Sequence, residues 1–233
     1  MRKLLLRSSS SRVSRFKILY ASNSCRYKHS LSKTTFNYGV QCPKHLYLHK
    51  HHKRLDISKE PFSEHEQQIM ASGQRVGALA QTLFPGGIDC SPVSHFDFTA
   101  SFKKTRKLVD LCMPVLYEAA FEASGVMVAV DVLALSPPAG GAAGEWHMYE
   151  VKSSTKVKPE HITDAALQCH ILQQSGLELA SVNIIHVDRT YTRPDSGPVN
   201  VQQLFKVVDI SQEVAALQST LPGQIQELQH MVA

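Results

Sequence analysis

Three charged residues stand in stretches of the sequence that otherwise read as buried β-strands: Asp131, Glu150 and Lys152. Side chains alternate between the two faces of a strand, so Glu150 and Lys152, two residues apart, project from one face. Asp131 is the only charged residue between Gly125 and Pro137, and an ionised carboxylate there is costly unless it is paired or binds a metal. Carboxylates can hold Mg²⁺ or Mn²⁺, and a neighbouring lysine can orient or deprotonate a metal-bound water, as hydrolysis of a phosphodiester requires.

A fourth charged residue, Glu118, lies in another strand-like run, Val115–Ala123. Three adjacent strands would bring Glu118, Asp131 and Glu150 together, with Lys152 one pleat away. The alternative is that Glu118 forms a structural ion pair with a basic residue of the preceding helix, such as Lys103, Lys104 or Arg106.

The elements that must position these residues follow from apolar periodicity and from Gly and Pro breaks. Helices are predicted at Glu64–Phe84, Thr99–Cys112, Pro159–Gln174 and Gln212–Val232, and strands at Val115–Ala123, Val126–Leu135, Trp146–Lys152 and Ser181–Asp188. The order is helix, three strands as a meander, helix, strand. It predicts an α/β fold with a mixed central sheet and helices packed against it.

The spacing of the charged residues resembles a known signature. Asp131, an interval of eighteen residues and then Glu150-Val151-Lys152 is similar to the D…E-x-K pattern of the PD-(D/E)XK nuclease superfamily. The segments around it resemble the RecB/Cas4-like branch, and most closely the nuclease region of the DUF2779 proteins, from about Leu31 to Arg193. These segments are Cys42-Pro43-Lys44, Tyr117-Glu118-Ala119-Ala120-Phe121 and Asp164-Ala165-Ala166-Leu167-Gln168.

The resemblance implies a restriction-endonuclease-like core and a metal-dependent nuclease, acting on DNA as a RecB-type exonuclease. It implies that Asp131 and Glu150 bind Mg²⁺ or Mn²⁺ with the carbonyl of Val151, and that Lys152 is catalytic. Glu118 would be a further acidic residue of the metal site. Gln168 matches the glutamine of the RecB-type Q-x-x-x-Y motif and would act in catalysis and in nucleic-acid binding. The alternative function is a non-catalytic nucleic-acid-binding or interaction module that retains the fold.

The helix after the third strand also bears on the site. His161, Asp164 and Gln168 share one helix face that could look into a cleft. Leu172 stands where the family motif has tyrosine, so substrate positioning can differ. Some relatives bind an iron–sulfur cluster through one early and three late cysteines. No cysteine follows Cys169, so no cluster is expected, and Cys42 is interpreted as a packing or vestigial residue.

Basic residues outside the signature are candidates for contacts with a nucleic-acid backbone. They are Lys103 and Lys104 in the predicted helix and Lys156 and Lys158 after the third strand. Residues 31–55 also interleave aromatic and basic side chains, which suits a nucleic-acid surface. In each case the alternative is an ordinary solvated basic face.

The two ends of the chain differ from the middle. Residues 1–55 hold thirteen Lys and Arg and no acidic residue, whereas the remainder holds twelve basic and twenty acidic residues. Residues 1–30 are rich in Arg, Ser and Leu, which predicts a mitochondrial or plastid transit peptide. The alternative is a disordered basic tail on a cytoplasmic protein. Residues 31–210 are predicted to form the nuclease-like domain. Residues 211–233 are predicted as an amphipathic helix, either self-packed or docking a protein partner, and no membrane-spanning run is expected.

Overall fold

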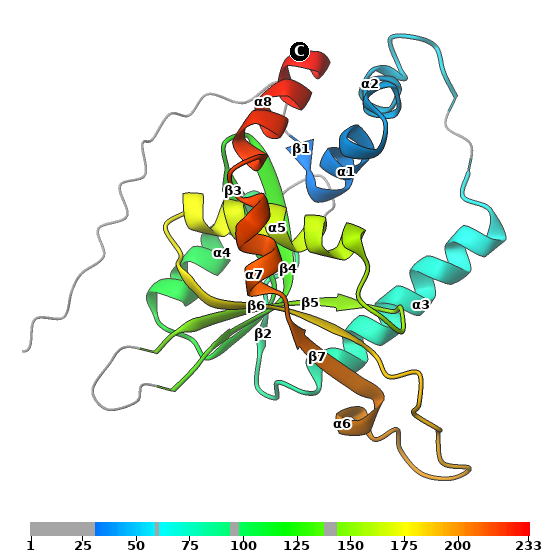
Figure 1. Cartoon of the computed structure of the whole chain (residues 1–233), viewed down its shortest axis with the longest axis vertical. Helices are drawn as coiled ribbons and strands as arrows, with labels where there is room; N and C mark the ends of the chain where they lie inside the picture. The colour runs from blue at the N-terminus through cyan, green and yellow to red at the C-terminus, as the bar shows by residue number, and fades with distance from the viewer. Residues whose placement is uncertain (1–30, 59–60, 94–97, 138–143) are drawn as a thin grey trace, which may run out of the picture.

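A computed structural model of the chain describes residues 31–58, 61–93, 98–137 and 144–233 (Figure 1). Its centre is a seven-stranded mixed sheet in the order β2-β3-β4-β5-β6-β7, with β1 paired separately to β4. The strands are β1 Leu31–Ser32, β2 Ile88–Asp89, β3 Val115–Ala123, β4 Val126–Leu135, β5 Trp146–Lys152, β6 Leu179–Val187 and β7 Phe205–Asp209. The helices are α1 Lys33–Gln41, α2 Pro43–His51, α3 Glu64–Gln81, α4 Thr99–Asp110, α5 Pro159–Gln174, α6 Val201–Leu204, α7 Ser211–Leu217 and α8 Leu221–Val232.

The predicted order of helix, three-strand meander, helix and strand is present as α4, β3-β4-β5, α5 and β6. Strands β3, β4 and β5 pair antiparallel, and α5 crosses over so that β6 runs parallel to β5. Ser124 and Gly125 make the two-residue β3–β4 turn with positive φ angles of 52° and 70°, the backbone that a tight hairpin needs. The prediction of a restriction-endonuclease-like α/β core is therefore confirmed.

Alternation along the strands divides the core into two layers. Met148 of β5 belongs to the larger cluster, which includes much of α5, α7 and α8. Its neighbours Tyr149 and Val151 pack instead in the smaller cluster, with Ala80 of α3. Helices α5 and α3 therefore cover opposite faces of the sheet, and Glu150 and Lys152 belong to the face covered by α5.

The C-terminal segment differs from the single helix predicted over Gln212–Val232. It forms two helices, because α8 restarts at Leu221 and has Pro222, which has no backbone N–H, in its first turn. The apolar residues Ile225, Leu228 and Val232 of α8 are buried in the core, so the self-packed alternative is the one observed. A protein partner at this apolar face gains no support.

Helices α1 and α2 are not among the helices predicted from apolar periodicity. Ser32 is the N-cap of α1, and its side chain accepts a hydrogen bond from the backbone of Thr35. Figure 1 shows α1 and α2 beside α8 on one side of the sheet. At Gly39 a Cβ atom would lie 2.6 Å from Leu228 Cδ2 and 2.8 Å from Leu46 Cδ2, so this close packing requires glycine.

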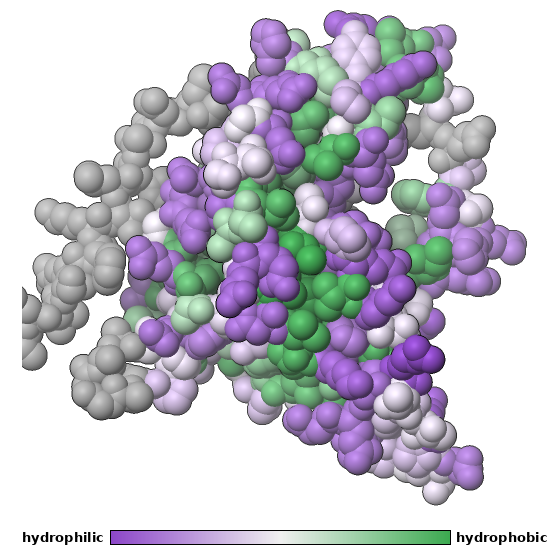
Figure 2. Space-filling view, viewed as in Figure 1, coloured by the Kyte–Doolittle hydropathy of each residue, from purple (hydrophilic) through white to green (hydrophobic). Residues whose placement is uncertain are grey.

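On the face shown in Figure 2, hydrophobic residues gather in a central band where helices meet the sheet, and hydrophilic residues dominate around it. Among the described helices, none has both the length and the apolar character needed to cross a bilayer. The predicted transit peptide, residues 1–30, lies outside the described residues.

Candidate active site

Asp131 lies where strands β4 and β5 separate. Their ladder ends at the pair Val132 and Tyr149, and continuing its register would place Asp131 opposite Glu150. Asp131 Oδ2 instead accepts a 2.6 Å hydrogen bond from the backbone N–H of Val151. The carboxylate thus satisfies an N–H group that the sheet leaves free, and this bond fixes Asp131 beside the end of β5.

Glu150 is the most enclosed charged group of the site, with 2% of its surface exposed. Its Oε1 atom lies 2.8 Å from the ammonium of Lys33 and 2.9 Å from that of Lys152. Its Oε2 atom accepts a 2.7 Å hydrogen bond from Gln168 Nε2. Buried carboxylates need such partners, because a lost hydrogen bond leaves the free-energy cost of removing the charge from water uncompensated.

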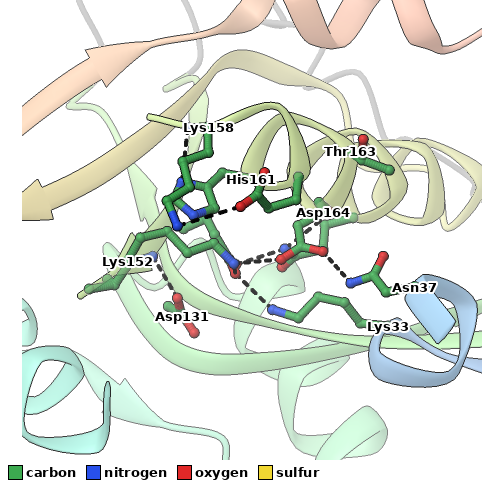
Figure 3. A network of polar contacts seen from close by, with 12 residues as sticks. Lys33, Asn37, Asp131, Lys152, Lys158, His161, Thr163 and Asp164 are labelled. Atoms are coloured by element: carbon green, nitrogen blue, oxygen red, sulfur yellow. Dashed lines mark hydrogen bonds and ion pairs between the residues drawn. The ribbon is translucent and has the colours of Figure 1, made fainter. Parts of the chain in front are cut away.

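Helix α5 supplies a second acidic residue next to Lys152. Lys152 Nζ lies 2.5 Å from Asp164 Oδ2, and the other oxygen of Asp164 accepts a hydrogen bond from Asn37 of α1. Figure 3 shows Lys33, Lys152 and Asp164 converging between the strands, α1 and α5. His161, Asp164 and Gln168 were predicted to share a helix face that looks into the site. Asp164 contacts Lys152, and Gln168 contacts Glu150. His161 is buried nearby, and its ring accepts from the N–H of Lys158.

Glu118 reaches the same place from β3. The register of β3 and β4 places it opposite Asp131, but the ladder skips this position. Its φ of 50° lies in the left-handed region, which costs a non-glycine residue about 1 kcal/mol and occurs often at functional sites. Among described residues its side chain makes no hydrogen bond or ion pair, so the predicted alternative of a pair with Lys103, Lys104 or Arg106 is not observed.

The pKa values of the carboxyl groups in the site are shifted in opposite directions. Burial, and then the charge of Glu150, raise the pKa of Asp131 to about 7. Burial opposes ionisation of Glu150 too, but Lys33 and Lys152 outweigh it and lower its pKa to about 2. Burial also raises the pKa of Glu118.

The two lysines of the site are held in their charged form. Burial disfavours the ammonium of Lys33, but Glu150 and Asp131 outweigh burial and raise its pKa. The pKa of Lys152 is raised against burial by Glu150 and Asp164. Both side chains therefore act at neutral pH as hydrogen-bond donors and positive charges. In this arrangement Lys152 is suited to orienting a water rather than to deprotonating it.

The donor set suits a hard divalent cation bound mainly through water and substrate. If ionised, Glu118, Asp131, Glu150 and Asp164 carry four negative charges against two on the lysines. Burial is the main cause of the raised pKa of Asp131, and the charges of Glu150 and Glu118 add to it. Mg²⁺ needs only one or two protein carboxylates when phosphate and water complete its shell. No group of three or more His, Cys, Asp or Glu side chains is arranged to enclose a metal within the described part of the chain. Asp131 and Glu150 are thus the residues that could hold the ion.

The remaining predicted residues lie at differing distances from this centre. Gln168 is fully buried, and its Oε1 atom has no hydrogen-bond partner among the residues that the structure describes. Lys104 donates a hydrogen bond to the backbone carbonyl of Asp89. The charge of the Asp89 side chain contributes to the raised pKa of Glu118. Lys103 and Lys156 are exposed, and Lys158 pairs with Glu160 at 3.6 Å. The roles of these lysines stay predictions.

Leu172 and Cys42, two further positions considered in the sequence, lie outside the polar network of the site. Leu172, at the position of the family tyrosine, is fully buried in the core and faces no cleft among the described residues. Cys42 is exposed between α1 and α2, so the interpretation as a packing residue is wrong.

Sequence reasoning missed Lys33 and Asn37, which α1 brings to the site from the start of the domain. The two are four residues apart and so share one helix face. The cap at Ser32 was a usable signal for where α1 begins, but nothing local indicated that α1 faces Glu150.

Comparison with known proteins adds little at the level of sequence. No family model and no curated protein sequence matches the chain. The solved structures similar to it include the crystal structure of LHK-Exo in complex with dAMP, with a TM-score of 0.39 and 12% identity over 88% of this chain and 93% of that one. Another is the crystal structure of SSO0001, with a TM-score of 0.36 and 12% identity over 85% and 76%. At these values the likeness does not identify a family, and the fold is defined by its own elements.

Proposed function

We propose that the chain is a metal-dependent nuclease of the PD-(D/E)XK type that hydrolyses phosphodiester bonds of DNA, acting as an exonuclease. One observation carries the proposal: Asp131 and Glu150 meet where β4 and β5 separate, with Lys152 2.9 Å from Glu150 on the same strand face. The match to the D…E-x-K spacing agrees with it.

Asp131 and Glu150 would hold Mg²⁺ or Mn²⁺, helped by the carbonyl of Val151 and by Glu118. A bound ion of this kind supplies charge neutralisation at the scissile phosphate and a water of lowered pKa. Lys152, protonated and held by Asp164, donates hydrogen bonds to the attacking water and to the charge that develops on phosphorus oxygens. Gln168 keeps the Glu150 carboxylate in one orientation, and its free Oε1 atom can accept from a bound water.

Binding of the nucleic-acid backbone is assigned to basic residues around the site. Lys156 and Lys158 follow β5 directly, and Lys103 and Lys104 lie on α4. Such contacts position the substrate without reading its sequence.

A second candidate function is a nucleic-acid-binding module without catalysis. A specific observation favours it: Lys33, Lys152 and Gln168 already satisfy both oxygens of Glu150 without a metal. Such contacts can have a purely structural role, in which they fasten α1 and α5 to the sheet.

The two functions are separated by incubating the full chain with end-labelled single- and double-stranded DNA and Mg²⁺ or Mn²⁺. Wild type is compared with Asp131→Asn and Lys152→Met, and with Lys206→Met as a matched control. Lys206 of β7 is half-exposed and pairs with Asp188, just after β6, at 3.0 Å, outside the network of Glu150 and Asp164. We expect release of mononucleotides by wild type and the control, and a loss of at least about 100-fold in the two site variants.

Equal cleavage by all four proteins would identify a contaminant and refute the nuclease. Absence of cleavage with DNA binding retained would support the module. Release of internal fragments rather than mononucleotides would replace the exonuclease assignment by an endonuclease.

A further inference from the structure

Within the described part of the chain, Lys33 is the cation of the site that acts on both proposed metal ligands. Its Nζ atom lies 2.8 Å from Glu150 Oε1, and Glu150 and Asp131 are the two largest charges that favour its ammonium form. Lys152, by contrast, is shared between Glu150 and Asp164. Lys33 therefore occupies the electrostatic position that a cation bound to Asp131 and Glu150 would need.

The stability of helix α1 gives no reason for a lysine at position 33. It is the first residue of α1, directly after the N-cap Ser32, and the first turn holds no acidic residue. A positive charge there has the wrong sign for the helix dipole. The interaction that compensates is the one with Glu150 across the site, so the lysine belongs to the site rather than to the helix.

The side chain of Lys33 is also able to move away from Glu150. Its side chain is 26% exposed, whereas that of Glu150 is 2% exposed. Lysine carries its charge on a flexible four-carbon stem. Helix α1 itself is anchored elsewhere, by Gly39 against Leu228 and by the hydrogen bond from Asn37 to Asp164. The ammonium can therefore move while its helix stays in place.

We infer that Lys33 is an exchangeable counter-ion: it neutralises Glu150 and Asp131 when no divalent cation is bound, and passes to a phosphate of the nucleic-acid substrate when one binds. Glu150 Oε1 already lies against two ammonium groups, so a divalent cation added there would meet strong repulsion from both. The metal therefore displaces Lys33, which, unlike Lys152, is not also paired with Asp164. The released ammonium lies beside the cleavage site, where Glu118 and the phosphates of the substrate backbone are the anions with which it can pair. This inference rests on the proposed metal-dependent function.

The first test measures Mn²⁺ binding to the full-length protein by titration calorimetry, without nucleic acid. Wild type is compared with Lys33→Met, which keeps the length of the side chain, and with Lys206→Met as the control. We expect Lys33→Met to bind Mn²⁺ roughly tenfold more tightly, the lower end of couplings between close charges, and the control to match wild type. Equal or weaker binding by Lys33→Met overturns the inference. If none of the three proteins binds Mn²⁺, the proposed metal site is refuted, and the inference with it.

A second test uses wild type alone, in case Lys33→Met does not fold. Reactivity of each lysine with an amine-acetylating reagent is measured by mass spectrometry with and without Mn²⁺. We expect acetylation of Lys33 to rise several-fold with Mn²⁺ and that of Lys206 to stay constant. No rise at Lys33 under conditions where calorimetry shows Mn²⁺ bound overturns the displacement step while leaving the metal site intact.

Transfer to phosphate is tested by DNA affinity at saturating Ca²⁺. For duplex DNA, loss of one phosphate contact lowers the slope of log affinity against log salt by about 0.9. We expect this change in Lys33→Met and not in Lys206→Met. An unchanged slope overturns the transfer.

Discussion

Replacing Asp131 by Asn tests the electrostatic description of the site most directly. Burial and the neighbouring Glu150 raise the pKa of Asp131 from an ordinary 3.8 to about 7. A carboxyl whose pKa is raised on folding stabilises the fold fully below its unfolded pKa, and this stability is lost as the pH rises through the folded pKa. Asn is neutral at every pH, and its side-chain oxygen can still accept from the N–H of Val151. The variant therefore removes the charge and keeps the hydrogen bond.

The expected size of the effect follows from the shift. One pKa unit corresponds to 1.36 kcal/mol, so the full shift is worth about 4 kcal/mol. Asp131 is partly exposed and its titration is linked to that of Glu150, so we expect a gain of roughly 2–4 kcal/mol in metal-free Asp131→Asn at pH 8. At pH 4 or below, the two proteins should be almost equally stable, and the gap should open between pH 4 and 7.

Urea denaturation in EDTA at pH 4, 6 and 8, followed by the fluorescence of the single tryptophan, Trp146, measures this gap. Asp209→Asn is the control, because hydrogen bonds from Ser211 lower the pKa of Asp209 and the variant should gain nothing at pH 8. Mn²⁺ at pH 8 should stabilise wild type more than Asp131→Asn. Equal gaps at all three pH values, or a less stable Asp131→Asn at pH 8, would refute the reasoning.

Other predictions concern packing, backbone strain and targeting. Gly39→Ala should lose about 1–3 kcal/mol in urea denaturation, because its Cβ would overlap Leu228, while Gly73→Ala in open space on α3 should gain about 0.5–1 kcal/mol; equal effects would contradict the packing of α1 on α8. Glu118→Gly should raise stability by about 1 kcal/mol by relieving a φ of 50°, and should lower cleavage in the labelled-DNA assay; a less stable variant would show that no strain is present. Residues 1–30 fused to a fluorescent reporter should direct it to mitochondria or plastids, and a diffuse cytosolic signal would end the targeting proposal.

The strand half of the site could be predicted because its information is local. Alternation places Glu150 and Lys152 on one face, and a lone Asp131 in an apolar run marks a position that needs a partner. The two-residue turn at Ser124 and Gly125 then fixes which residues of β3 and β4 face each other. The structure brings these residues together as the spacing indicated.

Other features of the structure could not be predicted from local sequence patterns. The backbone of Glu118 is left-handed although glutamate has no preference for that region, so only the fold imposes it. The break between α7 and α8 was missed because the apolar pattern continues through it, while Pro222 carried a usable signal for a restart. The two-residue strands β1 and β2 lack the length over which alternation can be recognised.

Lys33 shows why composition alone misjudges such a site. It is one of thirteen basic residues in the first 55, and locally nothing distinguishes it from the others. Its position depends on the pairing of Leu31 and Ser32 with distant Val126 and Met127, which starts α1 beside the open end of β5. The carboxylates of the site are thus placed by the alternation of side chains along three strands. The lysine that balances part of their charge is placed by a contact between segments far apart in the sequence. The contact between Lys33 and Glu150 therefore depends on where α1 is anchored, which no motif of the D…E-x-K type describes.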